Sequence, residues 1–132
     1  MNSVGKNARI LVVDDDGDSV EVLRELLEGV GYEVRTATDG TAALQFAASF
    51  EPDVVLLDIH LPGIDGFEIT RRLASSGPRP PRVVAMTGYS RLDGKLWAFG
   101  FEALLHKPIQ FGQALEVLAD LGFGCSAVCR SS

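Results

Sequence analysis

The stretch that decides the fold is 54–63, VVLLDIHLPG, near the middle of the chain. Its first four residues are apolar without a polar break, a pattern typical of a strand buried on both faces of a parallel sheet. The run then ends in a carboxylate, Asp58, and the turn pair Pro62-Gly63 follows shortly after. Because a charge at the end of a buried strand is costly unless another group pairs with it, the sequence predicts a partner opposite Asp58.

Outward from this stretch, short apolar runs alternate with segments of helical periodicity. The expected strands are 10–13, 32–37, 54–57, 82–86 and 103–106. A segment in which apolar residues recur at helical spacing follows each strand; the fourth helix is expected to use Leu92, Leu96 and Phe99. Parallel neighbours need crossover connections, so five strand–helix repeats predict a doubly wound α/β domain with a five-stranded parallel sheet.

Turn-forming residues agree with these divisions. Gly31 follows the first helix, Thr38 or Asp39 can cap the second, and Gly100 closes the fourth. The proline-rich loop at 77–81 cannot be helical. We therefore expect an N-terminal extension at 1–8, one domain at 9–121 and a flexible C-terminal tail at 122–132.

Composition limits the possible functions. The chain has 132 residues and a net charge of −6, which argues against a surface that binds nucleic acid directly. Its apolar runs fall well short of the roughly 20 residues that a membrane helix needs, and the first residues lack the apolar segment of a signal peptide. Both cysteines, Cys125 and Cys129, lie near the C-terminus, where they cannot link the core. We expect a cytoplasmic protein in a reducing compartment, with no membrane partner.

Polar residues of complementary type follow the predicted strands. Three aspartates at 14–16 end the first strand, Asp58 the third, Thr87 the fourth and Lys107 the fifth. In an open α/β sheet, the functional crevice lies outside the carboxyl ends of the strands. Clustered carboxylates need a cation, and Mg²⁺, which is bound through one or two carboxylates and several waters, suits an open rim. A carboxylate nucleophile, a divalent cation, a lysine and a threonine are the parts needed for phosphoryl transfer.

Four motifs together resemble the receiver domain of bacterial two-component response regulators: ILVVDDD, VVLLDIHLPGIDGFE, VVAMTG and HKP. The resemblance covers 9–121 and implies the flavodoxin-like (βα)5 receiver fold. It further implies a signalling phosphoacceptor, not a classical enzyme, whose partners are a sensor histidine kinase or histidine phosphotransfer protein and an unknown output partner. Dimerisation through the face from the fourth to the fifth helix is also possible on this reading.

The resemblance also assigns the metal site. Asp14 and Asp15 match the acidic pair that binds Mg²⁺ or Mn²⁺, with Asp15 the direct ligand and Asp14 acting more through water. Asp58 matches the aspartate that accepts the phosphoryl group, and it also binds the metal. The backbone carbonyl of His60 would be the third protein ligand.

The remaining roles lie on the last two strands. Thr87 matches the hydroxyl residue that turns toward the phosphoryl group, and Lys107 matches the lysine that pairs with it, next to a cis peptide bond at Pro108. His60 and Tyr89 occupy positions that influence phosphoryl lifetime. Leu104 departs from the family pattern: it stands where Tyr or Phe is common, which puts the aromatic half of the switch in doubt.

Other readings of the same residues remain open. The three aspartates at 14–16 could form a solvated turn that caps the first helix. Thr87 could have no role beyond starting a turn, and Lys107 could be a surface lysine. The chain could also be a phosphate-independent interaction module. A haloacid-dehalogenase-type phosphohydrolase uses similar groups, but its D-x-D nucleophile should end the first strand, and this chain has no room for a cap domain.

Overall fold

The computed structural model describes residues 8–61, 66–75, 77, 79–88 and 100–124. Within these ranges, the order of elements is β1 (Arg9–Val13), α1 (Gly17–Gly29), β2 (Glu33–Ala37), α2 (Gly40–Phe50), β3 (Val54–Asp58), α3 (Gly66–Ala74), β4 (Arg82–Thr87), β5 (Phe101–His106) and α5 (Phe111–Asp120). The predicted fourth helix, the turn at Pro62-Gly63, Tyr89 and the two cysteines lie outside the described residues.

The strands form one parallel sheet in the order β2-β1-β3-β4-β5. The chain moves outward from β1 to β2 and then returns past β1 to β3, so the strand order reverses beside β1. The doubly wound five-stranded fold predicted from the sequence is thereby confirmed. The reversal also identifies the crevice beyond the ends of β1 and β3 as the place where such a sheet binds its ligands.

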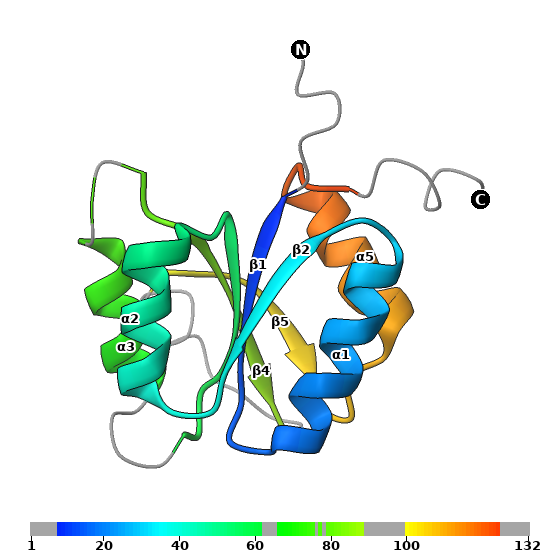
Figure 1. The fold of residues 1–132 in the computed structure, drawn as a ribbon, viewed down its shortest axis with the longest axis horizontal. Helices are drawn as coiled ribbons and strands as arrows, with labels where there is room; N and C mark the ends of the chain where they lie inside the picture. Colours follow the sequence, from blue (N-terminus) through cyan, green and yellow to red (C-terminus); the bar gives the residue numbers. More distant parts are fainter. Residues whose placement is uncertain (1–7, 62–65, 76, 78, 89–99, 125–132) are drawn as a thin grey trace.

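Helices α1 and α5 cover one face of the sheet and α2 and α3 cover the other (Figure 1). A hydrophobic core lies beneath each pair of helices. Along β3, Val54 and Leu56 face the core covered by α1 and α5, whereas Val55 and Leu57 face the core covered by α2 and α3. All four side chains have an exposed fraction of 0%. The unbroken apolar run therefore follows from helices covering both faces, as expected for a parallel strand between two neighbours.

The element boundaries follow local backbone chemistry. The Asp39 carboxylate caps α2 by accepting a hydrogen bond from the Ala42 N–H at 2.8 Å, one of the two caps that the sequence allowed. Gly31, just after α1, has a φ of 110°, a backbone conformation that glycine adopts without a steric penalty. Strand β2 begins at Glu33, one residue later than predicted, because the Tyr32 N–H still bonds to the Leu27 carbonyl of α1.

Two further structural findings bear on the predictions. Phe101 begins β5, two residues before the predicted start, and the register with β4 shifts between Val83 and Val84. The peptide bond between Lys107 and Pro108 is cis, as the resemblance implied. Within the described ranges, each helix is too short or too polar to span a bilayer.

Candidate functional site

The site lies at the carboxyl ends of the central strands, where backbone hydrogen bonds continue just beyond the sheet. The Asp14 N–H donates to the Ala37 carbonyl at 3.1 Å, and the Lys107 N–H donates to the Thr87 carbonyl at 2.7 Å. Asp58 is the last residue of β3 and pairs in register with Met86 of β4. The ladders thus bring the backbones of Asp14, Asp58 and Lys107 to one rim, as parallel strands require.

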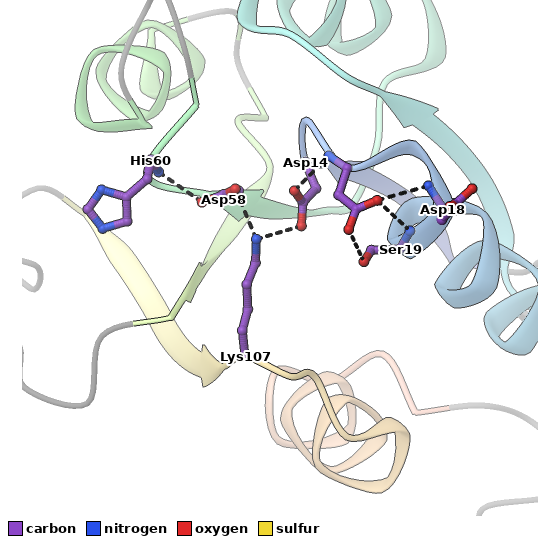
Figure 2. A network of polar contacts seen from close by, with 7 residues as sticks. Asp14, Asp18, Ser19, Asp58, His60 and Lys107 are labelled. Atoms are coloured by element: carbon purple, nitrogen blue, oxygen red, sulfur yellow. Dashed lines mark hydrogen bonds and ion pairs between the residues drawn. The ribbon is translucent and has the colours of Figure 1, made fainter.

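Lys107 is the partner that the buried Asp58 carboxylate was predicted to need. Its ammonium Nζ lies 3.0 Å from Asp58 Oδ2 and 2.8 Å from Asp14 Oδ2, so one cation bridges carboxylates from two strands (Figure 2). The other oxygen of Asp58, Oδ1, accepts the His60 backbone N–H at 2.9 Å. The two carboxyl side chains are 4% and 6% exposed, so both pairings form in a largely desolvated environment.

The electrostatics of this group are unbalanced. Burial raises the pKa of Asp14, and the hydrogen bonds from Lys107 and from the Asp16 N–H offset this effect only in part. Burial alone would lower the pKa of Lys107, but its hydrogen bonds to Asp14 and Asp58 outweigh burial and raise it. One ammonium therefore serves two buried carboxylates, and the group keeps an excess negative charge when both are ionised.

A divalent cation fits the donors that gather here. Asp14, Asp15 and Asp58 each offer a carboxylate oxygen, and these oxygens lie within 4.8 Å of one another. Two oxygens bound to one Mg²⁺ at about 2.1 Å are separated by at most about 4.2 Å, so a small inward adjustment would complete the contacts. Carboxylate oxygens are hard ligands, and Asp15 is exposed on the solvent side, where waters would complete an octahedron. The metal assignment of these three residues is thus sterically and chemically reasonable, and the His60 carbonyl as a further ligand stays a prediction.

Asp16 has a different role from its neighbours. Its carboxylate caps α1: Oδ1 accepts the N–H groups of Asp18 and Ser19 at 3.1 and 3.3 Å, and Oδ2 accepts the Ser19 hydroxyl at 2.9 Å (Figure 2). The hydrogen bonds from Ser19 lower the pKa of Asp16. The capping alternative therefore describes Asp16, while the carboxylates of Asp14 and Asp15 gather with Asp58.

The other predicted site residues occupy different environments. Thr87 is 0% exposed at the end of β4, directly beside the β5 terminus that leads into Lys107. Leu104 is half-buried and packs against the core beneath α2 and α3. His60 is exposed, and its backbone N–H donates to Asp58 Oδ1 (Figure 2). The influence of His60, Leu104 and Tyr89 on phosphoryl lifetime and switching stays a prediction.

A cavity of about 590 Å³ adjoins this site, and sequence reasoning did not anticipate it. It runs from Asp14 and Lys107 along α1 to the segment that enters α5, where Ile109 and Phe111 contribute apolar surface. On α1 it is bordered by Val22 and Leu26, which are 58% and 42% exposed. The signal available in the sequence was the four-residue spacing of these two apolar residues beside the buried stripe of the same helix.

Comparisons with known proteins agree with this fold and site. A family model described as the response regulator receiver domain matches residues 10–119, and the chain belongs to this family. The chain is 49% identical over 109 residues to the response regulator MprA of Mycolicibacterium vanbaalenii, a match that covers 81% of this chain and 47% of MprA. It is 51% identical over 89 residues to the response regulator PleD of Caulobacter vibrioides, covering 67% of this chain and 19% of PleD. The chain thus spans about half, or less, of the length of these relatives.

Solved structures show the same likeness. The chemotaxis response regulator CheY4 of Vibrio cholerae superposes with a TM-score of 0.78 at 29% identity, covering 88% of this chain and 99% of that one. A CheY-like receiver domain from Methylobacillus flagellatus reaches a TM-score of 0.80 at 26% identity, with 88% and 99% coverage. The resemblance stated from sequence motifs is therefore confirmed, and the domain is a signalling module of two-component systems.

Proposed function

We propose that this receiver domain accepts a phosphoryl group on Asp58 from the phosphohistidine of a sensor kinase or histidine phosphotransfer protein. The observation that carries the proposal is the position of Asp58: a buried carboxylate held by Lys107 at 3.0 Å and grouped with Asp14 and Asp15. Open α/β sheets bind their ligands at the point where strand order reverses, and phosphoryl transfer relies on cations held close to the transferred group, so grouped carboxylates and a lysine at this point support the proposal.

The chemistry assigned to Asp58 is an in-line displacement. One carboxylate oxygen forms a bond to phosphorus as the bond between phosphorus and the donor imidazole nitrogen breaks, and the electron pair leaves with that nitrogen. Bound Mg²⁺ would supply neutralisation of charge on the phosphoryl oxygens. Asp14, Asp15 and Asp58 would hold that ion, together with the backbone carbonyl of His60.

Lys107 and Thr87 would respond to the transferred group. Lys107 now contacts two carboxylate oxygens, and a phosphoryl group on Asp58 would offer its ammonium a stronger anionic partner. The Thr87 hydroxyl would donate to a phosphoryl oxygen from the end of β4. These movements would shift the conformational equilibrium of the face formed by β5 and α5, and so change its affinity for an output partner. Because Leu104 has no ring or hydroxyl, the switch would run through Thr87 without the aromatic movement.

Two alternatives differ in their support. A phosphate-independent interaction module is favoured by Leu104, which removes one half of the usual switch, and is disfavoured by the intact acidic cluster. A haloacid-dehalogenase-type phosphohydrolase would need the carboxylates of both aspartates in its D-x-D pattern, but the second of them here, Asp16, caps α1. Cytoplasmic location and dimerisation remain predictions from the sequence, which does not identify the output partner.

The proposal is tested by phosphorylation with a small donor. The purified chain is incubated with acetyl phosphate and Mg²⁺, and its intact mass is followed beside an Asp58→Asn variant. We expect one added phosphoryl group that is absent from the variant and absent when Mg²⁺ is chelated. A folded protein that gains no mass from acetyl phosphate, nor from a phosphorylated histidine phosphotransfer protein, would refute phosphoacceptor function.

A further inference from the structure

The helices α1 and α5, which cover the same face of the sheet, end in the same way. In α1 the N–H of Gly31 donates to the Glu28 carbonyl at 3.0 Å, and the N–H of Tyr32 donates to the Leu27 carbonyl at 3.2 Å. Gly31 has a φ of 110°. This pair of bonds around a left-handed glycine defines a Schellman motif, which satisfies carbonyls that a helix end otherwise leaves free.

The end of α5 repeats this geometry. The N–H of Gly122 donates to the Ala119 carbonyl at 3.0 Å, and the N–H of Phe123 donates to the Leu118 carbonyl at 2.8 Å. Gly122 has a φ of 96°. In both motifs the residue after the glycine is aromatic, and in both it packs in the same hydrophobic core as the leucine to whose carbonyl it bonds.

A hydrogen bond joins the two motifs. The Tyr32 hydroxyl donates to the Phe123 carbonyl at 2.5 Å, across 91 residues of sequence. Tyr32 is 5% exposed, and burial raises the pKa of its hydroxyl to about 12, so it remains a neutral donor at physiological pH. A buried tyrosine hydroxyl needs a partner, and this partner lies beyond residue 119, where the family match ends.

We propose that these paired caps form a clamp, in which the Tyr32 hydroxyl holds the Phe123 carbonyl and couples the end of α1 to the end of α5. The clamp lies at the end of the sheet opposite the rim that carries Asp58, because α1 and α5 both run away from that rim (Figure 1). It extends the folded unit from Leu121, the predicted boundary, to Gly124. The last described residues are thereby held beside the turn between α1 and β2.

The clamp predicts that disturbing one helix end loosens the other. Amide hydrogen exchange is measured on the full chain at the N–H groups of Tyr32 and Phe123, which report the α1 and α5 motifs respectively. Gly122→Ala, which places a side chain at φ 96° with open space around it, should accelerate exchange at its own end and at Tyr32. Gly31→Ala should likewise accelerate exchange at its own end, at Tyr32, and at Phe123. Gly17→Ala, at the start of α1 with open space and an ordinary φ, is the matched control and should change neither.

The hydroxyl itself is tested by Tyr32→Phe, which keeps the ring. We expect exchange at Phe123 to accelerate about fivefold, the factor equivalent to about 1 kcal/mol, with unchanged exchange in β3. In the Tyr32→Phe background, the effect of Gly122→Ala on the residue 32 amide should disappear. The clamp is overturned if Tyr32→Phe leaves Phe123 exchange unchanged, or if each glycine variant affects only its own helix end. Since Tyr32→Phe removes a single oxygen, it keeps the test decisive even where a glycine variant fails to fold.

Discussion

Replacing Lys107 with Met removes the ammonium that bridges two buried carboxylates and keeps a side chain of similar length. The metal-free variant should be less stable, because Asp14 and Asp58 lose contacts of 2.8 and 3.0 Å to a cation and face each other at low exposure. Removing one partner of a fully buried pair costs about 3–5 kcal/mol. Since the Lys107 side chain is 30% exposed, solvent screening reduces the expected loss to about 2 kcal/mol.

The same variant should bind Mg²⁺ more tightly. In the wild type, Lys107 Nζ contacts the Asp14 and Asp58 carboxylates, which the metal would also use, and so neutralises part of the negative charge that would attract the ion. Without the lysine, the carboxylates meet the ion with a full excess of negative charge. We expect the dissociation constant for Mg²⁺ to fall about tenfold, equivalent to about 1.4 kcal/mol.

Calorimetric titration and thermal unfolding with and without Mg²⁺ measure both effects. Saturating Mg²⁺ should recover most of the stability that the variant loses. Arg71→Met is the matched control: it removes one positive charge from a side chain that is 70% exposed and pairs only with Glu68 in the described ion pairs. It should leave the Mg²⁺ affinity unchanged. If Lys107→Met binds Mg²⁺ no more tightly than Arg71→Met, the ammonium does not compete with the metal and the charge argument fails.

Four further outcomes follow from the structure. Asp16→Ala should cost about 1 kcal/mol in unfolding free energy by removing the α1 cap, yet leave Mg²⁺ affinity within about twofold, as thermal melts and titrations would show. Gly66→Ala should destabilise by about 2–3 kcal/mol in chemical denaturation, because a Cβ would meet Ile59 Cα at 2.5 Å. The raised pKa of Asp14 means that its protonated form is favoured on folding, so in the metal-free protein the Asp14 carboxyl group should titrate by NMR with a midpoint above 3.8; a midpoint at or below 3.8 would contradict this. Burial raises the pKa of Tyr32 from 10.0 to about 12, so its contribution to the free energy of unfolding is complete below pH 10.0 and is lost as the pH rises toward about 12. Between these pH values, the free energy of unfolding of Tyr32→Phe should fall less steeply than that of the wild type in pH-dependent denaturation.

The fold could be predicted from the sequence because two periodicities alternate without ambiguity. Strand β3 is apolar at every position through Leu57, which only a sheet covered on both faces explains, and α1 shows buried residues at helical spacing. Within the part of the chain that the structure describes, the errors lie at element ends. Tyr32 was included in the predicted strand 32–37, but its N–H closes the cap of α1. Such boundaries depend on which carbonyl a single N–H reaches, and composition does not encode that choice.

The candidate site was predictable for a geometric reason: parallel strands deliver every carboxyl end to one rim, so order along the chain is enough to group Asp14, Asp58 and Lys107. The separate role of Asp16 was not predictable, since three successive aspartates look alike until the backbone turns into α1 and directs one carboxylate at the helix N–H groups. The cavity was missed for a similar reason. It is formed where α1 meets the segment after Pro108, and the relative placement of two helices is a property of packing, not of local pattern.

The two ends of the sheet, at the amino and carboxyl ends of its strands, differ in how fully their polar groups are satisfied. At the end that carries the clamp, the carbonyls of Leu27 and Leu118 accept backbone hydrogen bonds, and the Tyr32 hydroxyl donates a hydrogen bond to the Phe123 carbonyl. At the opposite end, which carries the site, the carboxylates of the described residues outnumber the ammonium of Lys107 that contacts them. Polar groups that are already satisfied gain little from a ligand, whereas an excess of carboxylates can lower its free energy by taking up a cation. The function proposed for Asp58 therefore uses the rim with excess negative charge, and the proposed clamp would provide a fixed frame at the other end of the strands, against which a change at that rim could be transmitted.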